Sequence, residues 1–229
     1  MTEFLLAIGA FLVAHVIPPM PPVQRFLTAF ASRRMYLLAY SLLSLVLIGW
    51  VIVAARRASY IGLWPWHPWQ TLVPLVGMPI AAWFVIVGFA EPNPLSISVR
   101  STIKSSLGPA AAITRHPILW GFLLWAATHI PPNGDAVSVI LFGVMASFAI
   151  AGFFVLDSRM RHRLGNSRWV QLSQATSIVP FAALIRGHAK IMSWRPLILA
   201  AAAAAVFYAW FILQGHRLLV GVDPLAGLR

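Results

Sequence analysis

The chain has 229 residues, 60% of them hydrophobic and 10% charged, with a net charge of +12 and no cysteine. A soluble domain carries about a quarter charged residues, so this composition excludes an ordinary soluble protein and predicts an all-α, polytopic integral membrane protein. The missing cysteine excludes disulfides, thiolate metal sites and haem attached through Cys-x-x-Cys-His, while the basic residues lie between apolar segments, where membrane orientation explains them without a nucleic-acid partner.

Six apolar segments predict six membrane-spanning helices that form one transmembrane domain over residues 1–229. In chain order they are expected at residues 4–17, 35–54, 72–90, 113–132, 136–156 and 196–213. The first segment stops at a run of prolines that begins with Pro18. Because Glu3 stands where a signal peptide would carry basic residues, this segment is expected to be a retained span.

The Lys and Arg residues predict the orientation of the chain. Of the 17, 13 fall in the loops after the first, third and fifth segments, and Arg56-Arg57 is the main exception. The positive-inside rule then places those loops in the cytoplasm and both termini in the periplasm. We therefore expect a multi-pass protein of the bacterial inner membrane, with the lipid bilayer as its partner.

Two of the seven histidines, His15 and His129, fall well inside predicted spans. An ionisable residue there is rare and is by default a functional candidate. Counted along their helices, the two histidines differ in depth by about 8 Å within a core of about 30 Å, an offset that axial ligands on opposite faces of an iron porphyrin tolerate. Phe11 and Trp125 precede them by four residues and would line an apolar pocket. A plain helix interface has the same pattern.

Arg115 and His116 precede Pro117 at the predicted inner interface. Proline suits the first turn of a helix, so His116 would lie at a helix N-terminus, where an anionic group such as a propionate or a phosphate binds readily. A solvated cap is the alternative. Asp157 begins the longest polar loop and is expected to pair with arginines of that loop.

Several motifs in combination resemble the NnrU family of bacterial membrane proteins. They cover most of residues 4–187 and are His15-Val-Ile-Pro-Pro, Thr114-Arg115-His116-Pro117 with Thr128-His129, the segment 157–165, and Thr176-Ser-Ile-Val-Pro-Phe-Ala-Ala-Leu-Ile-Arg-Gly187. The same marks are similar to those of the related 15-cis-zeta-carotene isomerases, membrane enzymes that hold haem b. The resemblance implies haem b whose iron is ligated by His15 and His129. Arg115 and His116 remain the further candidates for cofactor binding.

The resemblance implies either a redox-dependent isomerase acting on a polyene or other lipid, or a role linked to nitrogen oxides and denitrification. Ala126 stands where the isomerases have a cysteine implicated as an alternative ligand, so exchange to a thiolate is excluded here. A second hypothesis is a membrane methyltransferase of the isoprenylcysteine or phospholipid type, with Arg115 and His116 holding S-adenosylmethionine. It lacks the late acidic residues, since residues 168–186 contain no Asp or Glu. A third hypothesis is a non-catalytic haem-handling or respiratory assembly factor.

Overall fold

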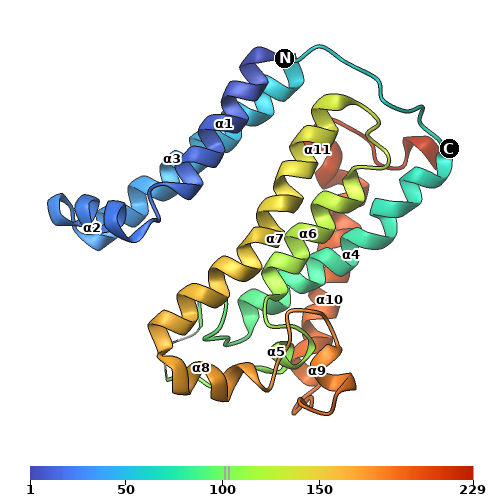
Figure 1. Cartoon of the computed structure of the whole chain (residues 1–229). Helices are drawn as coiled ribbons and strands as arrows, with labels where there is room; N and C mark the ends of the chain where they lie inside the picture. The colour runs from blue at the N-terminus through green and yellow to red at the C-terminus, as the bar shows by residue number, and fades with distance from the viewer. Residues whose placement is uncertain (101, 103, 229) are drawn as a thin grey trace. The chain divides into compact units, whose positions relative to one another are not determined.

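The computed structural model describes residues 1–100, 102 and 104–228 and is built from helices (Figure 1). Its contacts divide it into two compact units. The first unit is Met1–Pro65 with Gly134–Leu141, and the second is Trp66–Asn133 with Phe142–Arg229. The all-α fold class is thereby confirmed, while the expectation of one domain over residues 1–229 stays a prediction.

The first unit is a helical hairpin. It contains α1 (Thr2–Val16), α2 (Pro21–Phe30) and α3 (Arg33–Arg57), and α1 lies against α3 (Figure 1). Their antiparallel arrangement follows from two hydrogen bonds: Trp50 Nε1 donates to Glu3 at 3.4 Å, and the Tyr36 hydroxyl donates to the Pro18 carbonyl at 3.0 Å. The α1 helix ends before Pro18, because proline has no backbone N–H to continue the helical ladder.

The second unit is centred on α4 (Pro68–Ala90), which packs against α6 (Pro117–His129) and α10 (Arg195–Trp210). Glycines let α4 and α6 approach closely. A Cβ atom at Gly77 would lie 2.3 Å from Thr128 Cγ2, and one at Gly121 would lie 2.5 Å from Val85 Cγ2. Small residues at such crossings are the usual means by which membrane helices gain van der Waals contact.

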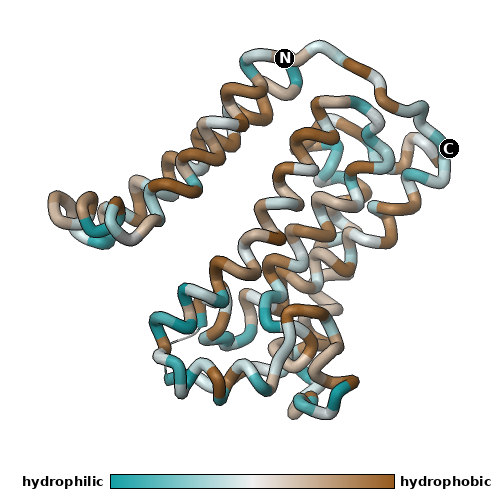
Figure 2. The backbone as a smooth tube through the Cα atoms, in the orientation of Figure 1, coloured by the Kyte–Doolittle hydropathy of each residue, from teal (hydrophilic) through white to brown (hydrophobic). Residues whose placement is uncertain are grey.

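The helix α7 (Ala136–Leu164) contacts α6 through the rings of Phe153 and Trp120, whose centroids are 5.6 Å apart. The short helices α5 (Pro109–Ile113), α8 (Asn166–Ser173) and α9 (Ala182–Ile185) gather at one end of the second unit (Figure 1). Figure 2 shows hydrophilic residues concentrated around the end of α7 and α8, and hydrophobic residues along the middle of α4, α6 and α7. This is the distribution of a helical unit whose apolar belt faces lipid.

Beyond α10 the helix widens for one turn. Residues Phe211–Gly215 form the π-helix η1, followed by α11 (His216–Val220) and the 3-10 turn η2 (Ala226–Leu228). The tail then returns to the start of α4, since η2 contacts α4 and a Cβ at Gly227 would lie 2.5 Å from the Trp66 ring. The tail therefore closes the end of the unit at which α4 begins.

Four helices among the described residues are long and apolar enough to cross a membrane: Arg33–Arg57, Pro68–Ala90, Ala136–Leu164 and Arg195–Val220. They correspond to four of the expected spans, and the protein is a multi-pass membrane protein. The other two expected spans are shorter helices, with 15 residues in α1 and 13 in α6. Thirteen residues extend only about 20 Å, less than the hydrocarbon core of about 30 Å. The count of six spans stays a prediction.

Candidate functional site

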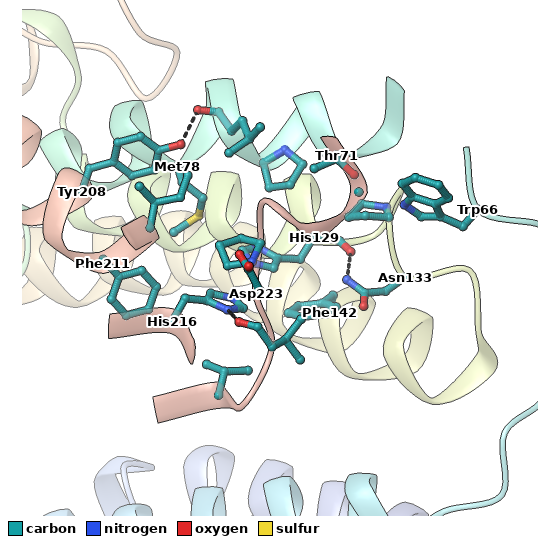
Figure 3. Close-up of a pocket in the computed structure, with 18 residues that line it drawn as sticks. Trp66, Thr71, Met78, His129, Asn133, Phe142, Tyr208, Phe211, His216 and Asp223 are labelled. Carbon is teal, nitrogen blue, oxygen red and sulfur yellow. Dashed lines mark hydrogen bonds between the residues drawn. The ribbon is translucent and has the colours of Figure 1, made fainter. Parts of the chain in front are cut away.

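The second unit contains a cavity of about 310 Å³. It is lined by residues of α4 and α6, by Phe142 of α7, and by the segment from α10 to the tail. Figure 3 shows its side chains, among them four aromatic rings: Trp66, Phe142, Tyr208 and Phe211. The Tyr208 hydroxyl donates to a backbone carbonyl of α4 at 2.8 Å, which fixes α10 against that wall. A mostly apolar cavity with few polar groups is typical of a small-molecule site.

His129 is the histidine of α6 that lines this cavity (Figure 3). Its Nδ1 is 2.7 Å from the carbonyl oxygen of Trp125, one helical turn earlier. Because a carbonyl only accepts, Nδ1 carries the proton and Nε2 carries a lone pair. The imidazole stacks on Phe142 with centroids 5.1 Å apart, and among the described residues its Nε2 has no hydrogen-bond partner. This geometry leaves His129 able to coordinate a metal.

A second histidine, His216, lines the same cavity from the start of α11. Its Nδ1 lies 2.8 Å from the carbonyl oxygen of Val222, so its tautomer is fixed in the same way. Its ring and that of Phe211 form a T-shaped pair with centroids 5.5 Å apart. Sequence reasoning did not single out His216, because it lies three residues beyond the end of the last expected span.

His15 belongs to the first unit, near the end of α1. It repeats the local geometry of His129: Nδ1 is 2.7 Å from the carbonyl oxygen of Phe11, four residues earlier, and the two rings stack at 4.0 Å. Tyr40 of α3 contributes a further ring at 5.8 Å. The expected aromatic neighbours at four residues' distance are therefore present beside both histidines.

Arg115 and His116 lie in a hydrogen-bonded cluster on the second unit. His116 is fully buried, with Nε2 2.8 Å from Asp157 Oδ1 and Nδ1 2.8 Å from Ser96 Oγ. Arg115 Nη1 donates to the other carboxylate oxygen of Asp157, and the guanidinium lies over the ring of Trp169 at 5.1 Å. Both ring nitrogens of His116 are thus engaged, and its role toward a cofactor stays a prediction.

The expectation that Asp157 pairs with arginines of its own loop is wrong. The helix α7 continues to Leu164 and ends before Gly165, which has a φ of 79°, a conformation that glycine readily adopts. Asp157 therefore lies on a helical turn facing the start of α6, and it pairs with Arg115 and His116. The ion pair ties two segments of the unit together.

Within residues 1–100, 102 and 104–228, no three His, Asp or Glu side chains lie close enough together to hold a metal ion. An iron porphyrin takes at most two axial ligands from the protein. Haem would not require such a group, because the porphyrin itself supplies the remaining ligands of the iron.

Comparison with known proteins identifies the family. A family model described as NnrU protein matches residues 3–224. The chain belongs to the NnrU family. This NnrU protein is also 35% identical over 79 residues to the chloroplastic 15-cis-zeta-carotene isomerase of Zea mays, an alignment that covers 34% of the chain and 21% of the isomerase. No solved structure matches it.

Proposed function

We propose that this NnrU protein binds haem b through His15 and His129 and has an isomerase-like activity on a polyene or other long unsaturated lipid. The observation that carries the proposal is the matched geometry of the two histidines. Each imidazole donates Nδ1–H to the carbonyl four residues earlier, at 2.7 Å in both cases, and each stacks on an aromatic ring. Metal-ligating histidines almost always have their second nitrogen held by a carbonyl or carboxylate in this way.

The residues of the second unit fit one face of a porphyrin. Phe142, Trp66 and Phe211 provide flat apolar walls, and His129 presents an imidazole among them. At about 310 Å³ the cavity is at the small end of the range for small-molecule sites. It would therefore hold part of the ring.

Bound haem would supply a redox-active iron that can polarise a carbon–carbon double bond. The chain's own contribution is to hold the ring, to exclude water through the apolar walls, and to admit a lipid tail from the bilayer. The part of the proposal that concerns isomerisation rests on the partial likeness to the maize isomerase. Cis–trans isomerisation consumes no co-reactant, and a membrane protein meets such apolar substrates in the bilayer itself.

The test is an absorption spectrum of the detergent-purified full chain, oxidised and reduced with dithionite, for the wild type and for His15→Ala, His129→Ala, His216→Ala and His162→Ala. We expect the sharp reduced bands of low-spin bis-histidine haem in the wild type and their loss in the first two variants. His162 is exposed on α7 and serves as the matched control. His216→Ala tests whether His216, the other imidazole of the cavity, is the second ligand instead of His15. If the low-spin bands are lost in His216→Ala and kept in His15→Ala, the second ligand is His216.

Full haem occupancy in His129→Ala would refute the ligation. A colourless protein from haem-replete cells that binds S-adenosylmethionine would favour the methyltransferase hypothesis instead. For activity, the haem-loaded protein is incubated with a cis-polyene in mixed micelles, and the isomers are separated by chromatography. Stable haem binding without any isomerisation would refute the proposed activity and favour the haem-handling hypothesis.

A further inference from the structure

A second cavity, of about 280 Å³, lies at the end of the second unit where α5 and α9 meet. It is formed by Arg115, by residues 176–179, and by Ala183, Arg186 and His188. It therefore brings together two of the sequence motifs, the Arg-His-Pro segment and the segment from Thr176 to Gly187. The proposed haem site uses neither of these walls.

Hydrogen bonds hold the walls of this cavity in place. The backbone N–H of Arg115 donates to the Ser177 carbonyl at 2.7 Å, and that of Phe181 donates to the Ile113 carbonyl at 2.7 Å. Phe181 has a φ of 64°, in the left-handed region that residues other than glycine rarely adopt. Such a conformation persists only where the surrounding contacts over-determine it, and it is typical of functional loops. The cavity is thus a fixed feature of the fold.

The charged groups that line the cavity are all basic. They are Arg115, Arg186 and His188, and the lining contains no Asp or Glu. Arg115 Nη1 and Nη2 are engaged by Asp157 and by the Ser173 carbonyl, but its Nε is buried and has no partner among the described residues. Asp157 and the Ser173 carbonyl thus hold the guanidinium in place beside the cavity.

We propose that this cavity binds the phosphate group of an anionic ligand, either the headgroup of a membrane lipid or a soluble phosphate ester. The exposed Arg186 and His188 line the cavity and provide positive charge and N–H donors, and Arg115 adds a guanidinium that is held in place. The Ser177 hydroxyl accepts from Val179 N–H, so its own proton is free to be donated. Several donors from different directions suit an oxyanion with more than two acceptor oxygens. The site does not depend on haem.

The experiment uses the full chain in detergent micelles. Native mass spectrometry compares retention of phosphatidylglycerol with that of a diacylglycerol bearing the same acyl chains, and calorimetric titration with glycerol phosphate tests the soluble source. The test variant is Arg186→Gln with His188→Gln. The matched control, Arg159→Gln with His162→Gln, removes the same two side-chain types from exposed positions on α7 outside this cavity.

We expect the wild type to prefer phosphatidylglycerol over diacylglycerol, the test variant to bind it about tenfold more weakly, and the control to bind like the wild type. Arg186→Lys, which keeps the charge, should retain most of the binding. If glycerol phosphate also binds and displaces the lipid, the site accepts soluble esters; if only the lipid binds, the ligand is a headgroup. Binding by the test variant equal to wild type in both arms, or an equal loss in the control, would overturn the proposal.

Discussion

Replacing Asp157 with alanine is expected to lower the free energy of unfolding by about 3 kcal/mol. The carboxylate accepts from Arg115 Nη1 through one oxygen and contacts His116 Nε2 through the other, at 2.8 Å. Alanine removes both acceptors and leaves a buried guanidinium whose Nε already lacks a partner among the described residues. The loss therefore exceeds that of a single surface pair.

The magnitude follows from the burial of the three groups. Breaking a buried ion pair by removing one partner costs about 3–5 kcal/mol. The side chains of Arg115 and Asp157 retain 12% and 19% of their exposure, which admits some water and puts the cost at the lower end of that range. Asp157→Asn keeps an oxygen acceptor but loses the charge, so an intermediate cost of about 1–2 kcal/mol is expected.

The assay is unfolding in mixed detergent micelles with increasing dodecyl sulfate, followed by far-ultraviolet circular dichroism. Asp135→Ala is the matched control, because Asp135 is at the other end of α7, where its Oδ1 accepts from Ser138 N–H at 3.0 Å as a helix cap. Loss of such a cap costs about 1 kcal/mol. If Asp157→Ala destabilises the protein no more than Asp135→Ala, the cluster does not join the two helices energetically.

Three further predictions concern other parts of the second unit. Gly121→Ala should destabilise the protein by about 1–3 kcal/mol in the same unfolding assay, because the new Cβ would lie 2.8 Å from a backbone carbonyl of α4. The control Gly143→Ala should be neutral or slightly stabilising, because a Cβ there meets nothing within 4 Å. An equal effect of both substitutions would contradict the close crossing of α4 and α6. Thr176→Val should cost about 1–2 kcal/mol, since its buried hydroxyl donates to the α5 backbone at 2.5 Å; no loss would mean that this bond contributes nothing. Burial raises the pKa of Glu91 above its ordinary value of 4.5, against the opposing charge of Arg100, so the native state binds more protons and stability should fall as the pH rises above 4.5. Glu91→Gln should flatten that part of the stability profile, and an unchanged slope would refute it.

The helical fold could be predicted from the sequence because the bilayer imposes a simple rule: long apolar segments without charge must form helices. Prolines and glycines set several boundaries, as at Pro18 after α1. The helix that contains the expected fifth span continues beyond it, since the apolar pattern stops at Leu156 but α7 extends to Leu164. Polar residues 157–164 contain no helix breaker, and the helix therefore continues to the next glycine.

The candidate site was predictable only in part. His129 was identified because an ionisable side chain in an apolar segment is conspicuous. The expected Trp125 lies beside its imidazole, but the cavity itself is lined by Trp66, Phe142, Tyr208 and Phe211. His216 was missed because its position facing the same cavity depends on how the chain turns after α10, which local periodicity does not encode. The partners of Asp157 were likewise missed, because pairing with Arg115 joins residues 42 positions apart.

The π-helix at Phe211–Gly215 determines where the final helix directs its side chains. Each residue of an α-helix advances by about 100° around the axis, and a π-turn accommodates one residue more than an α-turn does. Deleting a single residue there would restore an uninterrupted α-helix whose downstream residues keep their direction, because the π-turn accommodates its extra residue without turning the helix beyond it. An α-helix that kept all five residues would instead turn His216 by about 100°, away from the cavity. A relative of this protein that is one residue shorter in this segment would thus be compatible with the same cavity.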